Sequence, residues 1–78
     1  MSVAKVVHII GQSPESFAKA AESAIDEAAQ TIRNIKSFQV DQLSGEVADG
    51  KIVNYRASVQ IAFVVEHKSD QTAPGGQS

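Results

Sequence analysis

Cysteine and tryptophan are absent from this chain, and its aromatic residues are three phenylalanines and one tyrosine. Without cysteine the chain can form neither a disulfide nor a cysteine-based zinc or iron–sulfur site. A chain of 78 residues buries only about 60–65% of the surface that its unfolded form exposes. Small domains make up this shortfall with disulfides, metals or self-association. We therefore expect copies of the chain to associate with one another.

Clusters of basic residues and long hydrophobic runs are missing as well. Seven basic and nine acidic residues are spread along the chain, for a formal net charge of −2, which predicts no nucleic-acid partner. No hydrophobic run approaches the roughly 18 residues of a membrane span, and the start of the chain has no signal-peptide core. We expect a cytoplasmic protein with no membrane partner.

Motifs for chemistry are also missing. The sequence has no Gly-x-Ser-x-Gly motif, no glycine-rich phosphate loop and no paired carboxylates, so we predict that the protein is not an enzyme.

The first half of the sequence predicts a strand followed by a helix. A nearly continuous hydrophobic run predicts a strand over residues 4–10, ended by Gly11. Ser13 is typical of a helix N-cap and Pro14 of a first helical position, and the predicted helix ends near Asn34. Hydrophobic residues at steps of three and four give this helix one apolar stripe, much of it alanine: Phe17, Ala21, Ala24, Ile25, Ala28, Ile32 and Ile35.

The second half predicts a β-hairpin. A weakly patterned strand over residues 36–48 would carry Phe38 and Val40 on one face and Leu43 and Val47 on the other. Asp-Gly at positions 49 and 50 is a two-residue hairpin signal, because both positions tolerate positive φ. The third strand alternates clearly, with these hydrophobic residues on one side: Val53, Tyr55, Ala57, Val59, Ile61, Phe63 and Val65.

The lengths of these elements support self-association. A third strand of about 14 residues would span roughly 45 Å, whereas a helix of about 21 residues would span roughly 31 Å. A compact monomer of this size has a radius of gyration of only about 11–12 Å. One helix cannot cover such a sheet, so the sheet must twist around the helix and other copies must cover the remainder.

The order of these elements, together with three local motifs, resembles the dodecin family over about residues 3–66. The motifs are Gly11–Phe17, Thr31–Ile35, and Asn54–Phe63 after the Asp-Gly hairpin. The resemblance implies an α+β fold of β-α-β-β order, in which a three-stranded antiparallel sheet wraps around one helix. It also implies assembly into a hollow homododecamer that binds and stores a small ligand. We expect a dodecin-like domain at 1–66 and a disordered C-terminal tail at 67–78.

The family default ligand is a flavin, FMN or riboflavin, bound between subunits. In flavin-binding members, a tryptophan at the start of the second strand stacks on the ring and a glutamine of the third strand hydrogen-bonds the ring edge; here these positions are Ser37 and Arg56. Bacterial members often carry an arginine where this chain has Ser44, and Gln42 and Asp41 lie where relatives place a polar interface residue or a cation contact. Serine has no π-face, so stacking worth about 1–3 kcal/mol is absent. The candidate cofactor site consists of Ser37, Gln42, Ser44 and Arg56.

The same departures resemble a subgroup of dodecin-like proteins that lacks the tryptophan and is linked to cation binding. Carboxylate oxygens suit Ca²⁺ or Mg²⁺, which makes Glu46, Asp49 and Glu66 the candidate metal ligands. They form no loop motif, so separate copies would have to bring them together. His8 and His67 are far apart in the chain, so they predict no zinc site within one subunit. The alternative to a flavin store is therefore a flavin-free cage that binds cations or serves assembly alone.

Overall fold

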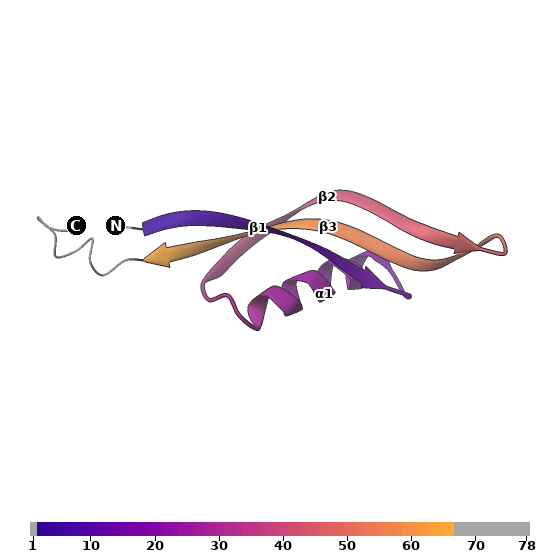
Figure 1. Ribbon diagram of the computed structural model, residues 1–78, viewed down its shortest axis with the longest axis horizontal. Helices are drawn as coiled ribbons and strands as arrows, with labels where there is room; N and C mark the ends of the chain where they lie inside the picture. The colour runs from indigo at the N-terminus through magenta and orange to yellow at the C-terminus, as the bar shows by residue number, and fades with distance from the viewer. Residues whose placement is uncertain (1, 67–78) are drawn as a thin grey trace, which may run out of the picture.

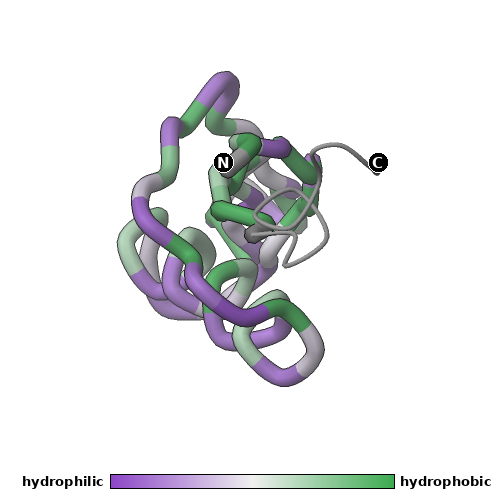
Figure 2. Tube along the Cα trace, turned by 90° about the vertical axis from the view of Figure 1, so that its left-hand side faces the viewer, coloured by the Kyte–Doolittle hydropathy of each residue, from purple (hydrophilic) through white to green (hydrophobic). Residues whose placement is uncertain are grey.

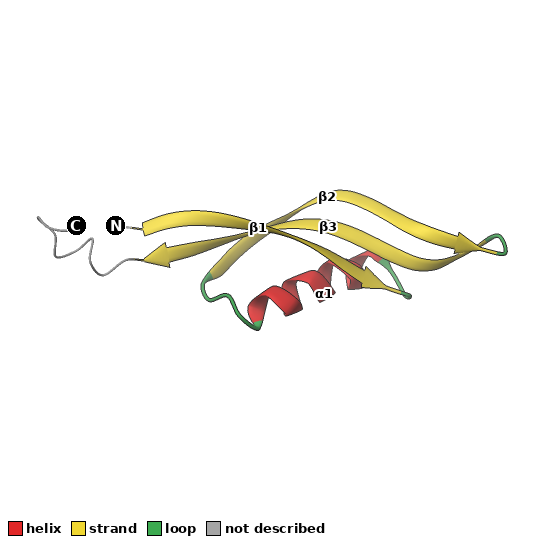
Figure 3. Ribbon diagram, viewed as in Figure 1, coloured by secondary structure: helices red, strands yellow, loops and turns green. Residues whose placement is uncertain are grey.

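The computed structural model describes residues 2–66; the expected tail at 67–78 lies outside the described residues. The chain forms a strand, a helix and two further strands, in the predicted β-α-β-β order (Figure 3). The elements are β1 (Ser2–Ser13), α1 (Phe17–Ala29), β2 (Ile35–Ala48) and β3 (Lys51–Glu66).

The three strands form one antiparallel sheet with the order β1-β3-β2. The central strand, β3, pairs with β1 from Tyr55 to Glu66 and with β2 from Lys51 to Phe63. Each end of the sheet is therefore only two strands wide. Figure 1 shows the β2–β3 hairpin extending past α1 at one end, while the start of β1 and the end of β3 extend past it at the other.

The predicted hairpin turn is confirmed. Asp49 and Gly50 have φ values of 53° and 76°, and the left-handed region is what a two-residue turn needs to match the twist of the flanking strands.

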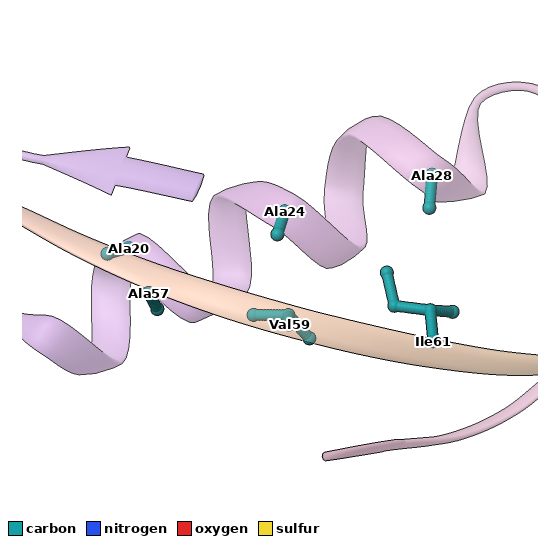
Figure 4. Packing of buried hydrophobic residues seen from close by; sticks show 6 residues of the cluster. All are labelled: Ala20, Ala24, Ala28, Ala57, Val59 and Ile61. Atoms are coloured by element: carbon teal, nitrogen blue, oxygen red, sulfur yellow. The ribbon is translucent and has the colours of Figure 1, made fainter. Parts of the chain in front are cut away.

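The core lies where α1 packs against the middle of one sheet face (Figure 4). Alanine predominates in it, so the helix approaches the sheet closely. At Gly11 an added Cβ would lie 1.9 Å from the backbone oxygen of Ala20, so no side chain fits there. The buried hydrophobic residues are Ala20, Ala24, Ala28, Ala57, Val59 and Ile61.

The helix is shorter than predicted. It begins after Ser16, whose side chain accepts a hydrogen bond from the backbone N–H of Lys19 at 3.0 Å. The predicted N-cap, Ser13, is instead the last residue of β1, and its hydroxyl accepts from the N–H of Glu15 at 2.9 Å. At the other end the helix stops at Ala29 rather than near Asn34.

The first strand is longer than predicted, because Gly11 does not end it. Gly11, Gln12 and Ser13 continue the ladder opposite Ala57, Arg56 and Tyr55. A glycine inside a strand often marks a close approach of another backbone, and here that backbone is the helix.

The predicted faces of the second strand were wrong, because β2 contains irregularities in its pairing. Phe38 and Val40 lie opposite Ile61 and Val59, but a register shift between Val40 and Gln42 leaves Asp41 as the extra residue. An extra residue reverses the alternation beyond it. Leu43 therefore shares the helix-side face with Phe38 and Val40, opposite Ala57.

The molecule is elongated, and its helix covers only part of the sheet. Its radius of gyration is 17.4 Å and its extents are 64 × 19 × 13 Å, whereas a compact chain of this size would have a radius of gyration of about 11–12 Å. It exposes 5448 Å², against about 4,600 Å² for a compact monomer of its mass. Figure 2 shows hydrophobic segments distributed around the whole trace. The exposed large hydrophobic residues include Val3, Val6, Ile10, Phe38, Leu43, Val47, Ile52 and Val53.

Within residues 2–66, no helix is both long enough and apolar enough to span a bilayer.

Candidate functional site

The sheet face opposite α1 carries most of the polar side chains of the sheet. Residues directly opposite one another in an antiparallel pair point to the same side, so the register fixes which side chains share this face. We call it the polar face; it consists of His8, Gln12, Gln39, Asp41, Gln42, Ser44, Glu46, Asn54, Arg56, Ser58 and Gln60.

One part of the polar face is organised around Arg56. Its guanidinium group lies 2.6 Å from Glu46 Oε2 and also donates to Gln12 Oε1 at 3.2 Å. The same Gln12 oxygen accepts a hydrogen bond from Asn54 Nδ2 at 2.8 Å. We call these four residues the arginine cluster. Because Glu46 neutralises Arg56, the arginine cluster is not an open anion receptor in the single chain.

A second part of the polar face is organised around His8, on β1, and Asp41, on β2. His8 Nε2 lies 3.5 Å from Asp41 Oδ2 and shares a hydrogen bond with the hydroxyl of Ser58. Gln60 Nε2 donates to Asp41 Oδ2 at 2.7 Å, and Gln39 Nε2 donates to Asp41 Oδ1 at 3.4 Å. We call His8, Asp41, Ser58 and Gln60 the histidine cluster.

The histidine cluster does not have the geometry of a nucleophilic triad, although it contains serine, histidine and aspartate. In a triad, the nucleophile and the carboxylate contact different ring nitrogens, so that the carboxylate orients the ring. Here Ser58 and Asp41 both approach Nε2 of His8. The arrangement therefore lacks a carboxylate that orients the ring through its other nitrogen.

The candidate cofactor residues fall into two places. Ser44 lies opposite Arg56 and Gln42 lies opposite Ser58, so the structure brings these candidates together. Ser37 lies opposite Ala62, which is six residues and roughly 20 Å along β3 from Arg56. Within one chain, Ser37 is therefore not part of the same site.

Ser37 borders a shallow hollow of ≈ 160 Å³ on the polar face. This hollow is too small to enclose a large planar ligand, since ligand pockets usually measure about 300–1,000 Å³. Its lining residues are Val6, Ser37, Phe38, Gln39, Gln60 and Ala62.

The candidate metal ligands do not meet within one chain. Glu46 is paired with Arg56, and Asp49 lies in the hairpin turn. Glu66 ends β3, twelve residues beyond the Asn54 that faces Glu46, which is roughly 40 Å along the strand. No group of three or more His, Asp or Glu side chains suited to a metal occurs in the part of the chain that the structure describes. A site built from these three carboxylates stays a prediction that requires other copies.

The opposite face of the sheet has an apolar groove between α1 and β2. Its volume is ≈ 540 Å³, and at one end the ring of Phe17 packs edge-on against that of Tyr55, with centroids 4.9 Å apart. The helix covers β1 and β3 but leaves this side of β2 open. The groove is lined by Phe17, Ala18, Ala21, Glu22, Ile25, Phe38, Val40 and Leu43.

Sequence reasoning missed the histidine cluster. His8 stands alone in its predicted strand, and nothing in the sequence brings it together with Asp41. The two come from the two edge strands and meet across β3 because Asp41 is the extra residue of a bulge. An aspartate in a weakly alternating strand was the only sequence signal for that bulge.

The fold and the polar face define a small α+β protein of β-α-β-β order, in which a central strand joins two clusters of polar side chains. The family model for dodecin matches residues 3–66. The chain therefore belongs to the dodecin family.

Curated relatives and solved structures agree with this assignment. The chain is 33% identical over 63 residues to a calcium dodecin of Mycobacterium tuberculosis, covering 81% of this chain and 89% of that protein. It is 27% identical over 64 residues to a dodecin of Thermus thermophilus, covering 82% of this chain and 93% of that protein.

Among solved structures, the dodecin of Streptomyces davaonensis matches with a TM-score of 0.80 at 29% identity, covering 85% of this chain and 97% of that one. The calcium dodecin of Mycobacterium tuberculosis, described as calcium-chelating and as having a calcium-binding site, matches with a TM-score of 0.70 at 30% identity. That match covers 97% of this chain and 99% of the other. The family thus includes a calcium-binding member of the same fold.

Proposed function

We propose that this protein is a homododecameric binding and storage shell whose polar faces hold a small ligand between subunits, and that this ligand is a cation rather than a flavin. The observation that carries the proposal is the large hydrophobic surface that the single chain leaves exposed. Hydrophobic side chains are exposed in the apolar groove, on the face opposite the polar face, and at the two-stranded ends of the sheet. Further copies would cover these surfaces and place polar faces at the interfaces.

Two features of the polar face favour a cation over a flavin. Ser37 offers no ring for stacking, and Arg56 is already engaged by Glu46 and Gln12. A flavin ring would have to displace this charged pair without the gain from stacking. The 33% identical relative that is named a calcium dodecin supports the same choice.

Native mass spectrometry of freshly purified protein tests the shell and its ligand together. We expect a species of twelve 8.3 kDa chains, about 100 kDa, at low micromolar protein. A monomer that stays folded under these conditions would contradict the shell.

Two further measurements separate the ligands. Calcium should raise the melting temperature of protein previously treated with EDTA, because an ion that binds the folded state stabilises it. Riboflavin fluorescence should not be quenched on addition of the protein. Yellow protein, or quenching at micromolar concentration, would replace the cation with a flavin while leaving the shell intact. An unchanged melting temperature with calcium would count against a structural calcium ion.

A further inference from the structure

We propose that the end of the β2–β3 hairpin of one copy packs into the apolar groove of the next copy. We call residues 46–54 the hairpin arm, and the groove is the one between α1 and β2. This contact depends on the self-association proposed above and identifies two of the surfaces that meet in it.

The hairpin arm carries hydrophobic side chains that are exposed in the single chain. Val47, Ile52 and Val53 are 69%, 54% and 47% exposed, and no other large hydrophobic side chain within residues 2–66 is more exposed than Val47. The helix begins beside Tyr55, against which Phe17 packs, and the hairpin turn lies about five residues, roughly 16 Å, farther along β3. Figure 1 shows this end of the hairpin extending past α1, so the helix of the same chain does not cover the hairpin arm.

The hairpin arm presents hydrophobic residues on the helix side of the sheet. Leu43 points to that side, and Val47 follows it at an alternate position of β2. The next register shift leaves Val53 of β3 as the extra residue, so it does not interrupt the alternation of β2. Ile52 is directly opposite Val47 and shares its side. Two branched side chains therefore extend the apolar surface of β2 beyond the end of the helix.

The groove is a suitable surface for the hairpin arm of another copy but not for that of its own chain. Its volume is ≈ 540 Å³, and its lining residues are hydrophobic except Glu22. Phe38 and Leu43, on its β2 side, are each more than half exposed. Val47 lies four residues from Leu43 along the same strand, roughly 13 Å away, and an extended strand does not fold back on itself over that distance. The groove and the hairpin arm can therefore meet only between copies.

Two observations favour a second copy over other occupants of the groove. Residues 67–78 contain no large hydrophobic residue, so they offer little to an apolar groove. The chain exposes roughly 850 Å² more than a compact monomer of its mass, which is close to the ≈ 800 Å² that each partner contributes to a standard stable interface. A small molecule in the groove would leave the hairpin arm exposed, whereas a second copy covers both surfaces at once.

The charges at the two surfaces are complementary. Glu22 is the charged residue that lines the groove, and Lys51 is the basic residue of the hairpin arm. Both are exposed, and neither has an ion-pair partner within residues 2–66. Of the acidic residues in the hairpin arm, Glu46 is paired with Arg56 and Asp49 lies in the turn. A pair between Glu22 and Lys51 at the rim would fix the orientation of the hairpin arm more than its affinity.

The hairpin arm and the groove are different surfaces, so the contact is head-to-tail. Each copy inserts its hairpin arm into one neighbour and receives that of another, and such a contact closes into a ring when rotation returns to the first copy. A hollow shell of twelve equivalent copies has only two-fold and three-fold axes, and a two-fold axis joins identical surfaces. We therefore expect the ring to be a trimer.

Cross-linking tests the contact, because the chain has no cysteine of its own. Full-length protein carrying both Glu22→Cys and Lys51→Cys is treated with a short bismaleimide, denatured and separated by size. We expect covalent dimers and trimers and nothing larger. Within one chain the two positions lie roughly 20 Å apart along the molecule, because α1 runs from Phe17 away from the hairpin arm. A short reagent therefore links only different copies.

Three variants serve as controls. Glu22→Cys alone and Lys51→Cys alone should stay unlinked, because the contact joins two different surfaces. Glu27→Cys combined with Lys51→Cys should also stay unlinked, since Glu27 is exposed on the same helix but does not line the groove. Native mass spectrometry of each variant before cross-linking shows whether the shell has formed.

Carbodiimide coupling of the unchanged protein provides a test that needs no substitution. The reagent activates a carboxylate, and attack by a lysine amine releases the activating group and forms an amide. We expect a bond between Glu22 and Lys51 of different copies, identified by mass spectrometry of peptides from the covalent dimer. The yield should fall several-fold in Ile52→Asp and stay the same in Ile52→Leu, because only the first change places a charge on the face of the hairpin arm that enters the groove.

The contact and the shell fail in different ways. If the unchanged protein assembles but neither reagent links the two positions, the contact between the hairpin arm and the groove is wrong and the shell stands. Dimers of the Glu22→Cys protein would mean that two grooves face each other, which also contradicts the contact. Covalent species larger than a trimer would exclude the closed trimer. An unchanged protein that is monomeric at low micromolar concentration would contradict both the contact and the shell.

Discussion

The two sides of the central strand differ in how the chain covers them. On the β1 side, α1 packs over the sheet and buries Ala57, Val59 and Ile61 completely. On the β2 side, no residue of β2 is buried, and Phe38 and Leu43 are each more than half exposed. Hydrophobic residues face the helix side of the sheet on both sides of β3. The two sides therefore differ in whether α1 covers them and not in their composition. One half of the sheet is covered within the chain, and the other half is left open.

A side chain at Gly11 should reduce the stability of the covered half more than any other change considered. Gly11→Val should destabilise the protein by more than about 3 kcal/mol, because its side chain would occupy the space of the Ala20 carbonyl and push the helix away. Thermal unfolding monitored by circular dichroism measures the effect. As a control, Gly50→Asn places a side chain in open space at positive φ, which asparagine tolerates, and should change stability by less than about 1 kcal/mol. A Gly11→Val protein of normal stability would show that the helix does not pack as described.

Truncation of one buried and one exposed hydrophobic side chain to alanine should show the same asymmetry. Ile61→Ala empties a fully buried position and should cost about 2–5 kcal/mol in chemical unfolding. Val47→Ala, near the exposed hairpin end, should cost less than about 0.5 kcal/mol unless another copy covers it. Similar costs for the two variants would mean that assembly buries the hairpin as thoroughly as the helix buries the centre.

A charge in the uncovered half should affect assembly more than the fold of the chain. Leu43→Asp places a carboxylate in the apolar groove, and each leucine that another copy would bury contributes about 1.5–3 kcal/mol. We expect smaller species by native mass spectrometry, with the β-strand signal retained. Leu43→Met keeps the hydrophobic surface and should assemble normally. Complete assembly of Leu43→Asp would show that the groove is not an interface.

The ion pair of the polar face should matter least for stability. Glu46→Gln removes the carboxylate from Arg56, both partners being partly exposed, and should cost no more than about 1 kcal/mol. The difference from the unchanged protein should shrink at high salt, because salt screens exposed charges. Thermal unfolding at low and high ionic strength measures it, and a large, salt-independent loss would indicate that the pair is buried by assembly.

Much of the fold could be predicted because its signals are local. Alternation identified β3 and its buried face, three- and four-residue spacing identified the helix, and Asp-Gly identified the turn. The helix start was misplaced because Ser13 and Ser16 are both suitable N-cap residues. Ser13 instead pairs with Tyr55 as the last residue of β1, so the helix begins after Ser16. Of the candidate site, Gln42, Ser44 and Arg56 do lie together on the polar face. Their ligand stays a prediction, as do the metal roles of Glu46, Asp49 and Glu66.

The amino-acid sequence by itself determined the order of the elements, the hairpin, and a sheet too long for its helix, because each of these depends on neighbours within a few residues. Tertiary structure alone decided that Asp41 is the extra residue of a bulge, that Leu43 turns toward the helix, and that His8 meets Asp41 beside Gln60. The physical reason is that register between strands is a long-range property. One inserted residue changes the face of every side chain after it, and no local preference records that choice.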